Sequence, residues 1–155
     1  MALELSTIGV SLKYCVETNA GTRPTAGYTS IAGIKAIPDL NPEPEALDVT
    51  DLSDSWRRYI PGVKDVGGAI SFTANFTSAF KTAWTALVSA ATTGAASNKA
   101  TWFEVSVPTL GSFYFSGIPS DLGLTGMEVN AVVEIEAYVT PNKIHGWDTS
   151  STGSA

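Results

Sequence analysis

The sequence is poor in the residue types from which most metal sites and active sites are built. Its 155 residues include one cysteine, Cys15, and one histidine, His145. A zinc site of thiolates and imidazoles needs about four ligands, so this sequence excludes one, and a lone cysteine forms no internal disulfide. A Ser-His-Asp triad would depend on His145, which precedes Gly146 near the end of the sequence, whereas a catalytic base must be held rigidly. We interpret His145 as an exposed surface residue.

Charge is also scarce. Charged residues make up 15% of the chain, against roughly 25% in typical soluble domains. A surface with so few charges favours association with further copies of the same chain. The net charge is −6, and the nine basic residues are scattered from Lys13 to Lys143. Because phosphate binding needs clustered Lys and Arg, this pattern argues against a nucleic-acid reader.

Long apolar runs are missing as well. No run approaches the ~20 residues that a membrane-spanning helix requires, so we expect no membrane insertion. Residues 1–4 lack the basic start of a secretory signal, and we therefore expect synthesis in the cytoplasm.

Two further patterns are too weak to indicate catalysis. The glycine-rich run 62–68 lacks the Gly-Lys-Ser/Thr order of a phosphate-binding loop. Glu43 with Glu45, and Glu134 with Glu136, are carboxylates two residues apart, a spacing that on a strand usually marks a solvated face and not a glycosidase pair. We predict a protein that is not an enzyme and has no catalytic, cofactor-binding or metal-binding residues.

The residues that are present predict a mainly β protein with one flanking α-helix, arranged as a β-sandwich or an open barrel. Alternation of apolar and small or polar residues is typical of half-buried strands. It occurs in residues 8–16, 69–76, 103–107, 113–117 and 128–140. Apolar residues at helical spacing predict a helix over residues 78–91, capped by Thr77 or Ser78. They are Phe80, Ala83, Trp84, Leu87, Val88 and Ala91. Residues 92–100 are expected to form a loop.

We expect one domain over residues 1–145 and a flexible tail over residues 146–155. Within the domain, residues 41–68 stand out because they contain six of the fifteen acidic residues: Glu43, Glu45, Asp48, Asp51, Asp54 and Asp65. A short strand is expected at residues 47–52, followed by an irregular segment over residues 53–68. We predict a long projecting loop. In the alternative, its aromatic residues fold back onto the core of the same subunit as a satellite cluster.

Two stretches of the sequence resemble the signature of phage major tail-tube proteins. The first is IPDLNPEPEALDVTDLSD (residues 37–54) followed by RRYIPGVKDVGG (residues 57–68). The second is FYFSGIPSDLG (residues 113–123), which leads into EVNAVVE (residues 128–134). Order and spacing agree, and the resemblance covers residues 8–144.

The resemblance implies a tail-tube fold, related to the tubes of contractile tails and type VI secretion systems. It also implies hexameric rings that stack into a hollow tail tube, through which phage DNA passes during ejection. The expected location is the virion tail, after assembly in the host cytoplasm. The expected partners are further copies of the chain, a tape-measure protein, a tail terminator and distal tail or baseplate proteins.

Two sets of residues follow as candidates for this assembly. The resemblance suggests that the projecting loop contacts adjacent subunits or rings, with Arg-carboxylate pairs setting the register. Its candidates are Asp51, Asp54, Trp56, Arg57, Arg58, Tyr59, Ile60 and Pro61. The expected strand 128–140 carries acids opposite its apolar face, and we predict that Glu128, Glu134 and Glu136 face the lumen and repel DNA. The alternative function is a receptor- or carbohydrate-binding β-sandwich module without enzymatic activity.

Overall fold

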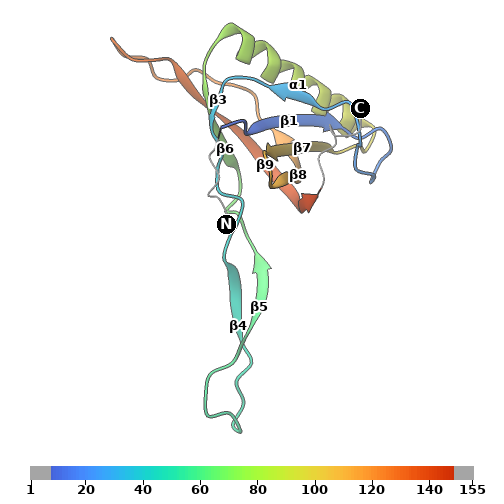
Figure 1. Cartoon of the computed structure of the whole chain (residues 1–155), viewed down its shortest axis with the longest axis vertical. Coiled ribbons are helices and arrows are strands. Elements are labelled where there is room, and N and C mark those ends of the chain that lie inside the picture. The colour runs from blue at the N-terminus through green and yellow to red at the C-terminus, as the bar shows by residue number, and fades with distance from the viewer. Residues whose placement is uncertain (1–7, 149–155) are drawn as a thin grey trace.

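The computed structural model describes residues 8–148, which form one curled antiparallel sheet, one helix and one projecting hairpin (Figure 1). The sheet contains β1 (Ser11–Val16), β2 (Thr29–Ile31), β3 (Ile34–Ala36), β6 (Ile70–Asn75), β7 (Thr101–Val107), β8 (Gly111–Pro119) and β9 (Glu134–Asp148). The hairpin consists of β4 (Pro44–Asp48) and β5 (Tyr59–Lys64), and the helix is α1 (Ser78–Ala96).

The sheet comes close to closing into a barrel. Its strand order is β2-β1-β7-β8-β9-β6-β3, so β2 and β3 form its two edges although they are neighbours in the sequence. Only Ala32 and Gly33 separate them. Gly33 has a positive φ of 86°, and its carbonyl accepts a hydrogen bond from the Asn75 amide on β6 at 3.0 Å. The prediction of a mainly β fold with one helix is confirmed, and the single curled sheet makes it an open barrel.

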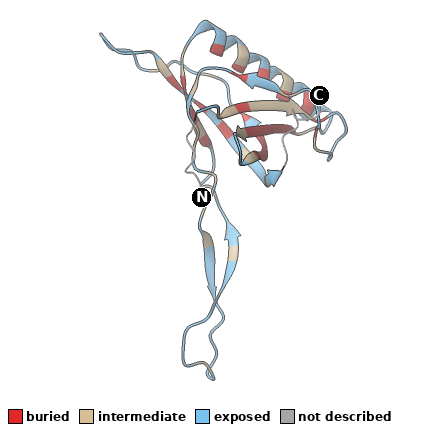
Figure 2. Cartoon of the chain, in the orientation of Figure 1, coloured by how far each residue is buried: buried red, intermediate tan, exposed pale blue. Residues whose placement is uncertain are grey.

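Helix α1 covers the concave face of the sheet with one apolar stripe (Figure 2). The hydroxyl oxygen of Thr77 accepts a hydrogen bond from the Phe80 amide at 3.2 Å and caps the first turn. The buried helical residues are Phe80, Trp84, Leu87, Ala91 and Gly94. Phe80, Trp84 and Leu87 join a core whose centre includes Phe115 stacked on Phe103, with ring centroids 5.1 Å apart.

The helix ends at Ala96, five residues beyond the predicted end at residue 91, so the expected loop over residues 92–96 is wrong. The polar run Thr92–Thr93 is compatible with helix because both hydroxyls donate to carbonyls four residues earlier. Gly94 lets the last turn approach β1 closely, since a Cβ there would lie 2.6 Å from Cγ1 of Val16.

Strand β9 is displaced along the sequence from its predicted position. The expected strand 128–140 begins only at Glu134, and it continues to Asp148. The first part of β9 pairs with β6, and the ladder with β8 holds it from Val139 onward. Residues 146–148 are therefore ordered in a strand, and their assignment to a flexible tail is wrong. The remainder of that expected tail, residues 149–155, lies outside the described residues.

Gly117 should be among the glycines that tolerate substitution least. A Cβ at this position would lie 2.7 Å from the Thr140 carbonyl oxygen and 2.9 Å from Cγ1 of Val139. We expect Gly117→Ala to lower the free energy of unfolding by about 1–3 kcal/mol, because strand β9 must shift. Chemical denaturation measures this effect. Gly123→Ala is the matched control, since nothing lies within 4 Å of a Cβ there. Equal stability of the two variants would contradict the close contact between Gly117 and strand β9.

Candidate functional site

Residues 41–68 form a hairpin that projects from the barrel (Figure 1). Its strands pair only with each other, with Asp48 opposite Tyr59 and Leu47 opposite Ile60. The irregular segment predicted for residues 53–68 is wrong in part, because β5 occupies Tyr59–Lys64. Pro61 is the reason that this strand was not predicted from the sequence. A proline is compatible with it because each strand of an isolated hairpin has one edge that needs no donor.

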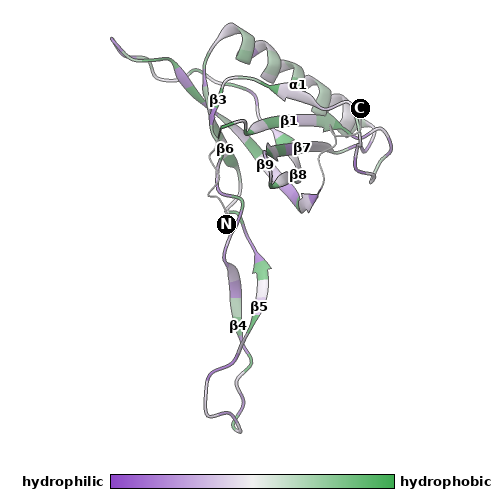
Figure 3. Ribbon diagram, viewed as in Figure 1, coloured by the Kyte–Doolittle hydropathy of each residue, from purple (hydrophilic) through white to green (hydrophobic). Residues whose placement is uncertain are grey.

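The aromatic residues of the hairpin do not fold back onto the core. The side chain of Trp56 is 84% exposed, and Tyr59 and Ile60 are also exposed. The satellite-cluster alternative is therefore wrong. Figure 3 shows apolar positions along the hairpin, and Figure 2 shows that nearly all of it is exposed. The exposed large apolar residues are Leu47, Val49, Leu52, Trp56, Tyr59, Ile60 and Val63. Such a concentration is typical of an interaction surface.

The charged residues of the hairpin tip pair with one another. A terminal nitrogen of Arg57 lies 2.8 Å from Oδ2 of Asp48, and Nε of Arg58 lies 2.8 Å from Oδ2 of Asp54. Hydrogen bonds from Thr50 lower the pKa of Asp48, and hydrogen bonds from Ser53 lower that of Asp51. Both arginines thus have partners within their own tip. These pairs define the shape of the tip, and the exposed Leu52 and Trp56 are left as its apolar contacts.

The second candidate surface is the outer face of β6 and β9. Glu134, Glu136 and Tyr138 alternate with the buried Ile135, Ala137 and Val139. Opposite the first three lie Asn75, Thr73 and Ser71 of β6. This face is polar and acidic, although Lys35 pairs with Glu134. The hydroxyl of Tyr138 donates to Oε2 of Glu136 at 2.9 Å, which raises the pKa of Tyr138.

Glu128 does not belong to this face. It precedes β9 by six positions in an exposed segment without strand pairing, so its predicted place beside Glu134 and Glu136 is wrong. The alternation of residues 128–133 resembles that of a strand, but within the described chain no neighbouring strand pairs with them. Sequence periodicity reports which residues alternate and not whether a partner strand is present.

Sequence reasoning missed a second projection, residues 120–133, which we call the arm. It connects β8 to β9 and extends from the barrel (orange in Figure 1). Leu124 is 86% exposed and Val129 is 92% exposed, and Met127 and Val132 are exposed too. The composition of the arm could have indicated it, because residues 121–133 contain only two charged residues, Asp121 and Glu128.

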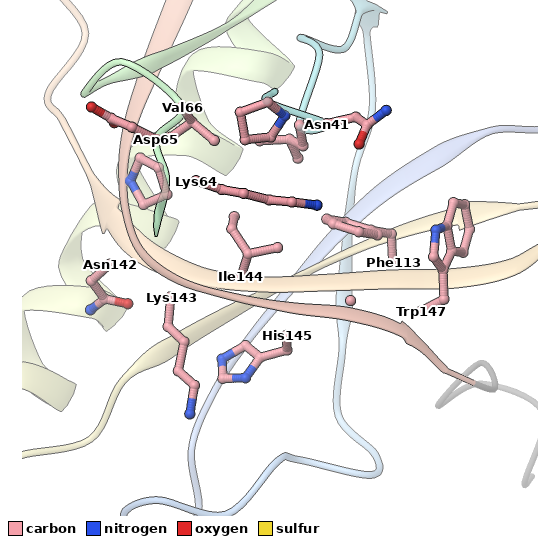
Figure 4. Close-up of a pocket in the computed structure, with 14 residues that line it drawn as sticks. Asn41, Lys64, Asp65, Val66, Phe113, Asn142, Lys143, Ile144, His145 and Trp147 are labelled. Atoms are coloured by element: carbon pink, nitrogen blue, oxygen red, sulfur yellow. The ribbon is translucent and has the colours of Figure 1, made fainter. Parts of the chain in front are cut away.

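A groove with a volume of about 670 Å³ lies between the base of the hairpin and the second half of β9 (Figure 4). Its apolar lining includes Leu40, Val66, Phe113, Ile144 and Trp147. The ring of Phe113 meets the edge of Trp147, with centroids 5.4 Å apart. Trp147 nevertheless remains 57% exposed. Sequence reasoning had assigned this tryptophan to a flexible tail and so missed the groove.

The histidine is not an exposed surface residue as predicted. His145 stacks on Trp102, with ring centroids 3.7 Å apart, and its Nε2 lies 3.2 Å from Oγ of Ser116. Burial lowers the pKa of His145, and the charge of Lys143 acts in the same direction. The hydroxyl of Ser116 donates to Oδ1 of Asn142 at 2.7 Å. The hydroxyl proton of Ser116 is therefore already used in a hydrogen bond to an amide oxygen.

A carboxylate beside this histidine has a structural role. Glu17 accepts hydrogen bonds from Nε1 of Trp102 at 3.0 Å and from the Ala100 and Gly21 amides. Burial raises the pKa of Glu17, but these hydrogen bonds outweigh burial and lower the pKa. The carboxylate thereby ties the loop after β1 to the start of β7. Over residues 8–148, no group of three or more His, Cys, Asp or Glu side chains is placed to hold a metal ion.

Among the described residues, no helix is both long and apolar enough to cross a membrane. Comparison with family models and with curated proteins found no match. Comparison with solved structures found a chain described as the tail of an empty GTA particle, determined by helical refinement with C6 symmetry. The two chains share 17% sequence identity at a TM-score of 0.55. The match covers 90% of this chain and 96% of the other, so the two share a fold over nearly their whole lengths.

Proposed function

We propose that this chain is a structural tail protein whose copies close into hexameric rings and stack into a hollow tube that conducts DNA. The observation that carries the proposal is the fold shared over 90% of the chain with a component of a tail that has C6 symmetry. The resemblance of residues 37–68 and 113–134 to tail-tube signatures supports it independently. On this proposal the chain belongs to the virion tail, and its first partners are further copies of itself.

The surfaces of the subunit fit such an assembly. The hairpin presents exposed apolar residues at the far end of a projection, which suits a contact with an adjacent subunit or ring. The polar and acidic face of β6 and β9 suits a lumen wall. Carboxylates repel phosphates, whereas lysine and arginine would form salt-dependent contacts with passing DNA.

Negative-stain electron microscopy of the purified chain tests the proposal. Rings with six-fold symmetry, or tubes built from them, are the expected result. Discrete monomers or trimers at high protein concentration would refute it and favour the receptor- or carbohydrate-binding module. The large exposed apolar area on the hairpin is the reason to expect assembly without additional factors.

The assignment of the lumen face leads to a prediction for Glu136. The substitution Glu136→Lys should leave rings and tubes intact, because this side chain is exposed and outside the core. It should slow DNA ejection and make tubes retain DNA at low salt, since every subunit then presents a cation to the phosphates. Ejection kinetics and DNA co-sedimentation measure these effects.

Glu136→Gln is the matched control because it removes the charge without reversing it. Glu134 is less suitable for this test, since its replacement by lysine would place a second cation beside Lys35. Normal ejection from Glu136→Lys particles, with no DNA retained, would show that this face does not line the channel.

A further inference from the structure

Strand β9 has an open edge along the groove. It pairs with β6 from Glu134 to Val139 only, and with β8 from Val139 to Asp148. Residues 141–147 therefore have no strand partner, among the described residues, on the side where β6 ends. This edge lines the groove together with residues 40–42 and 64–66 at the base of the hairpin. An unpaired strand edge next to apolar side chains is a template for the addition of an extended segment.

The arm has the properties of a segment that adds to such an edge. It has no internal strand pairing, turns at residues 129–130, and exposes Leu124, Met127 and Val129. Leu122 packs against the core of its own subunit, so Leu124, Met127 and Val129 are the apolar residues that the arm offers to a partner. The arm and the hairpin leave the barrel in different directions (Figure 1). A groove at the base of the hairpin is thus better placed to receive the arm of another copy.

The charges of the two surfaces are complementary. Lys64 extends across the groove (Figure 4), and no carboxylate of the described chain lies within ion-pair distance of its ammonium group. The arm contains Asp121 and Glu128 and no basic residue, and neither acid has an ion-pair partner in the described chain. An acid on the arm of a second copy has the charge that a partner of Lys64 requires.

We propose that the arm of one subunit docks into the groove of a second copy and adds a strand beside residues 141–147 of β9. The exposed apolar residues of the arm, Leu124 among them, pack against Phe113, Ile144 and Trp147. An acid of the arm pairs with Lys64. This contact is heterologous and separate from the hairpin tip, and it specifies the partner within the self-assembly of the proposed function.

Cysteine crosslinking tests the contact directly. In a Cys15→Ser background, one chain carries Leu124→Cys and a second carries Ile144→Cys. After mixing and mild oxidation, we expect a disulfide-linked dimer on non-reducing gels, because strand addition brings the two positions within disulfide distance. Each variant oxidised alone is the control. Absence of the mixed dimer, while rings or tubes form, would overturn the proposal.

A charge substitution supplies a second readout. Leu124→Asp should abolish assembled particles while the melting temperature of the subunit stays unchanged, because Leu124 is 86% exposed. Leu110→Asp is the matched control, since this leucine is 57% exposed in the β7–β8 turn and lies in neither surface. Normal assembly of Leu124→Asp particles would contradict docking of the arm.

These outcomes separate the inference from the proposed function. If the unmodified chain forms neither rings nor tubes, the tube proposal fails, whereas the mixed disulfide at high concentration still reports on the arm and groove. If residues 1–7 of the same chain fill the groove, Leu5→Cys combined with Ile144→Cys forms an internal disulfide in the monomer. That result would overturn the inference and leave the tube proposal standing.

Discussion

In the proposed tube, aspartate at both Leu52 and Trp56 is expected to abolish growth and to leave a folded subunit. The two side chains are 107% and 84% exposed at the tip of the hairpin, so folding of the barrel does not depend on them. Burying a leucine and a tryptophan against a neighbour contributes roughly 3–6 kcal/mol per contact. Its loss would weaken each contact by about a hundred-fold or more. Electron microscopy and sedimentation velocity measure the assembly.

A control with the opposite charge distinguishes the effect of lost apolar burial from the effect of added charge. Lysine at the same two positions removes the same apolar surface and introduces the opposite sign. Equal loss of assembly with aspartate and lysine would identify apolar burial as the cause, whereas loss with one sign alone would identify electrostatics. Full-length tubes from the aspartate variant would show that the tip is not an assembly contact. Circular dichroism should show an unchanged fold in every variant.

Trp84→Ala should have the largest effect on stability. Trp84 is fully buried, lies beside Phe80 with ring centroids 5.8 Å apart, and donates from Nε1 to the Ser120 carbonyl at 2.8 Å. Removing the indole leaves a cavity under α1, so the free energy of unfolding should fall by about 3–5 kcal/mol. Chemical denaturation gives this value. Retention of wild-type stability would contradict the packing of α1 against the sheet.

Two further variants separate the contributions of packing and of the hydrogen bond to this loss of stability. Trp84→Phe retains most of the apolar volume but removes the donor to Ser120, so its effect should be smaller, about 1–3 kcal/mol. Trp56→Ala is the matched tryptophan control, and it should leave subunit stability within about 0.5 kcal/mol of wild type because the residue is exposed. Ser120 begins the arm, so Trp84 also fixes the point at which the arm leaves the barrel.

The elements that sequence reasoning located are those whose periodicity depends on the core. In α1, Phe80, Trp84 and Leu87 face inward, and in β6 the buried Ile70 and Phe72 alternate with polar residues. Burial on one side imposes the spacing directly on the sequence. The ends of the elements were harder to predict from the sequence, because the extension of α1 depends on its close approach to β1 at Gly94.

The candidate surfaces were harder to predict because they depend on pairing. Strand β5 has six residues of which none is buried, so no apolar alternation marks it. The second half of β9 is ordered by its ladder with β8, from Phe115 opposite Ile144 to Ser112 opposite Asp148. Its sequence alone resembles a polar terminus. Composition did indicate the unusual hairpin, since six acids and exposed aromatic residues occur together in residues 41–68.

The length of β9 has a mechanical consequence. Its 15 residues form one strand, which is bonded to β6 over its first part and to β8 over its second, where the ladder with β8 has two register shifts. Tension along this strand loads both ladders in shear, so many hydrogen bonds share the force and do not open one at a time. A pull at either end is thereby transmitted through the covalent backbone across the whole subunit.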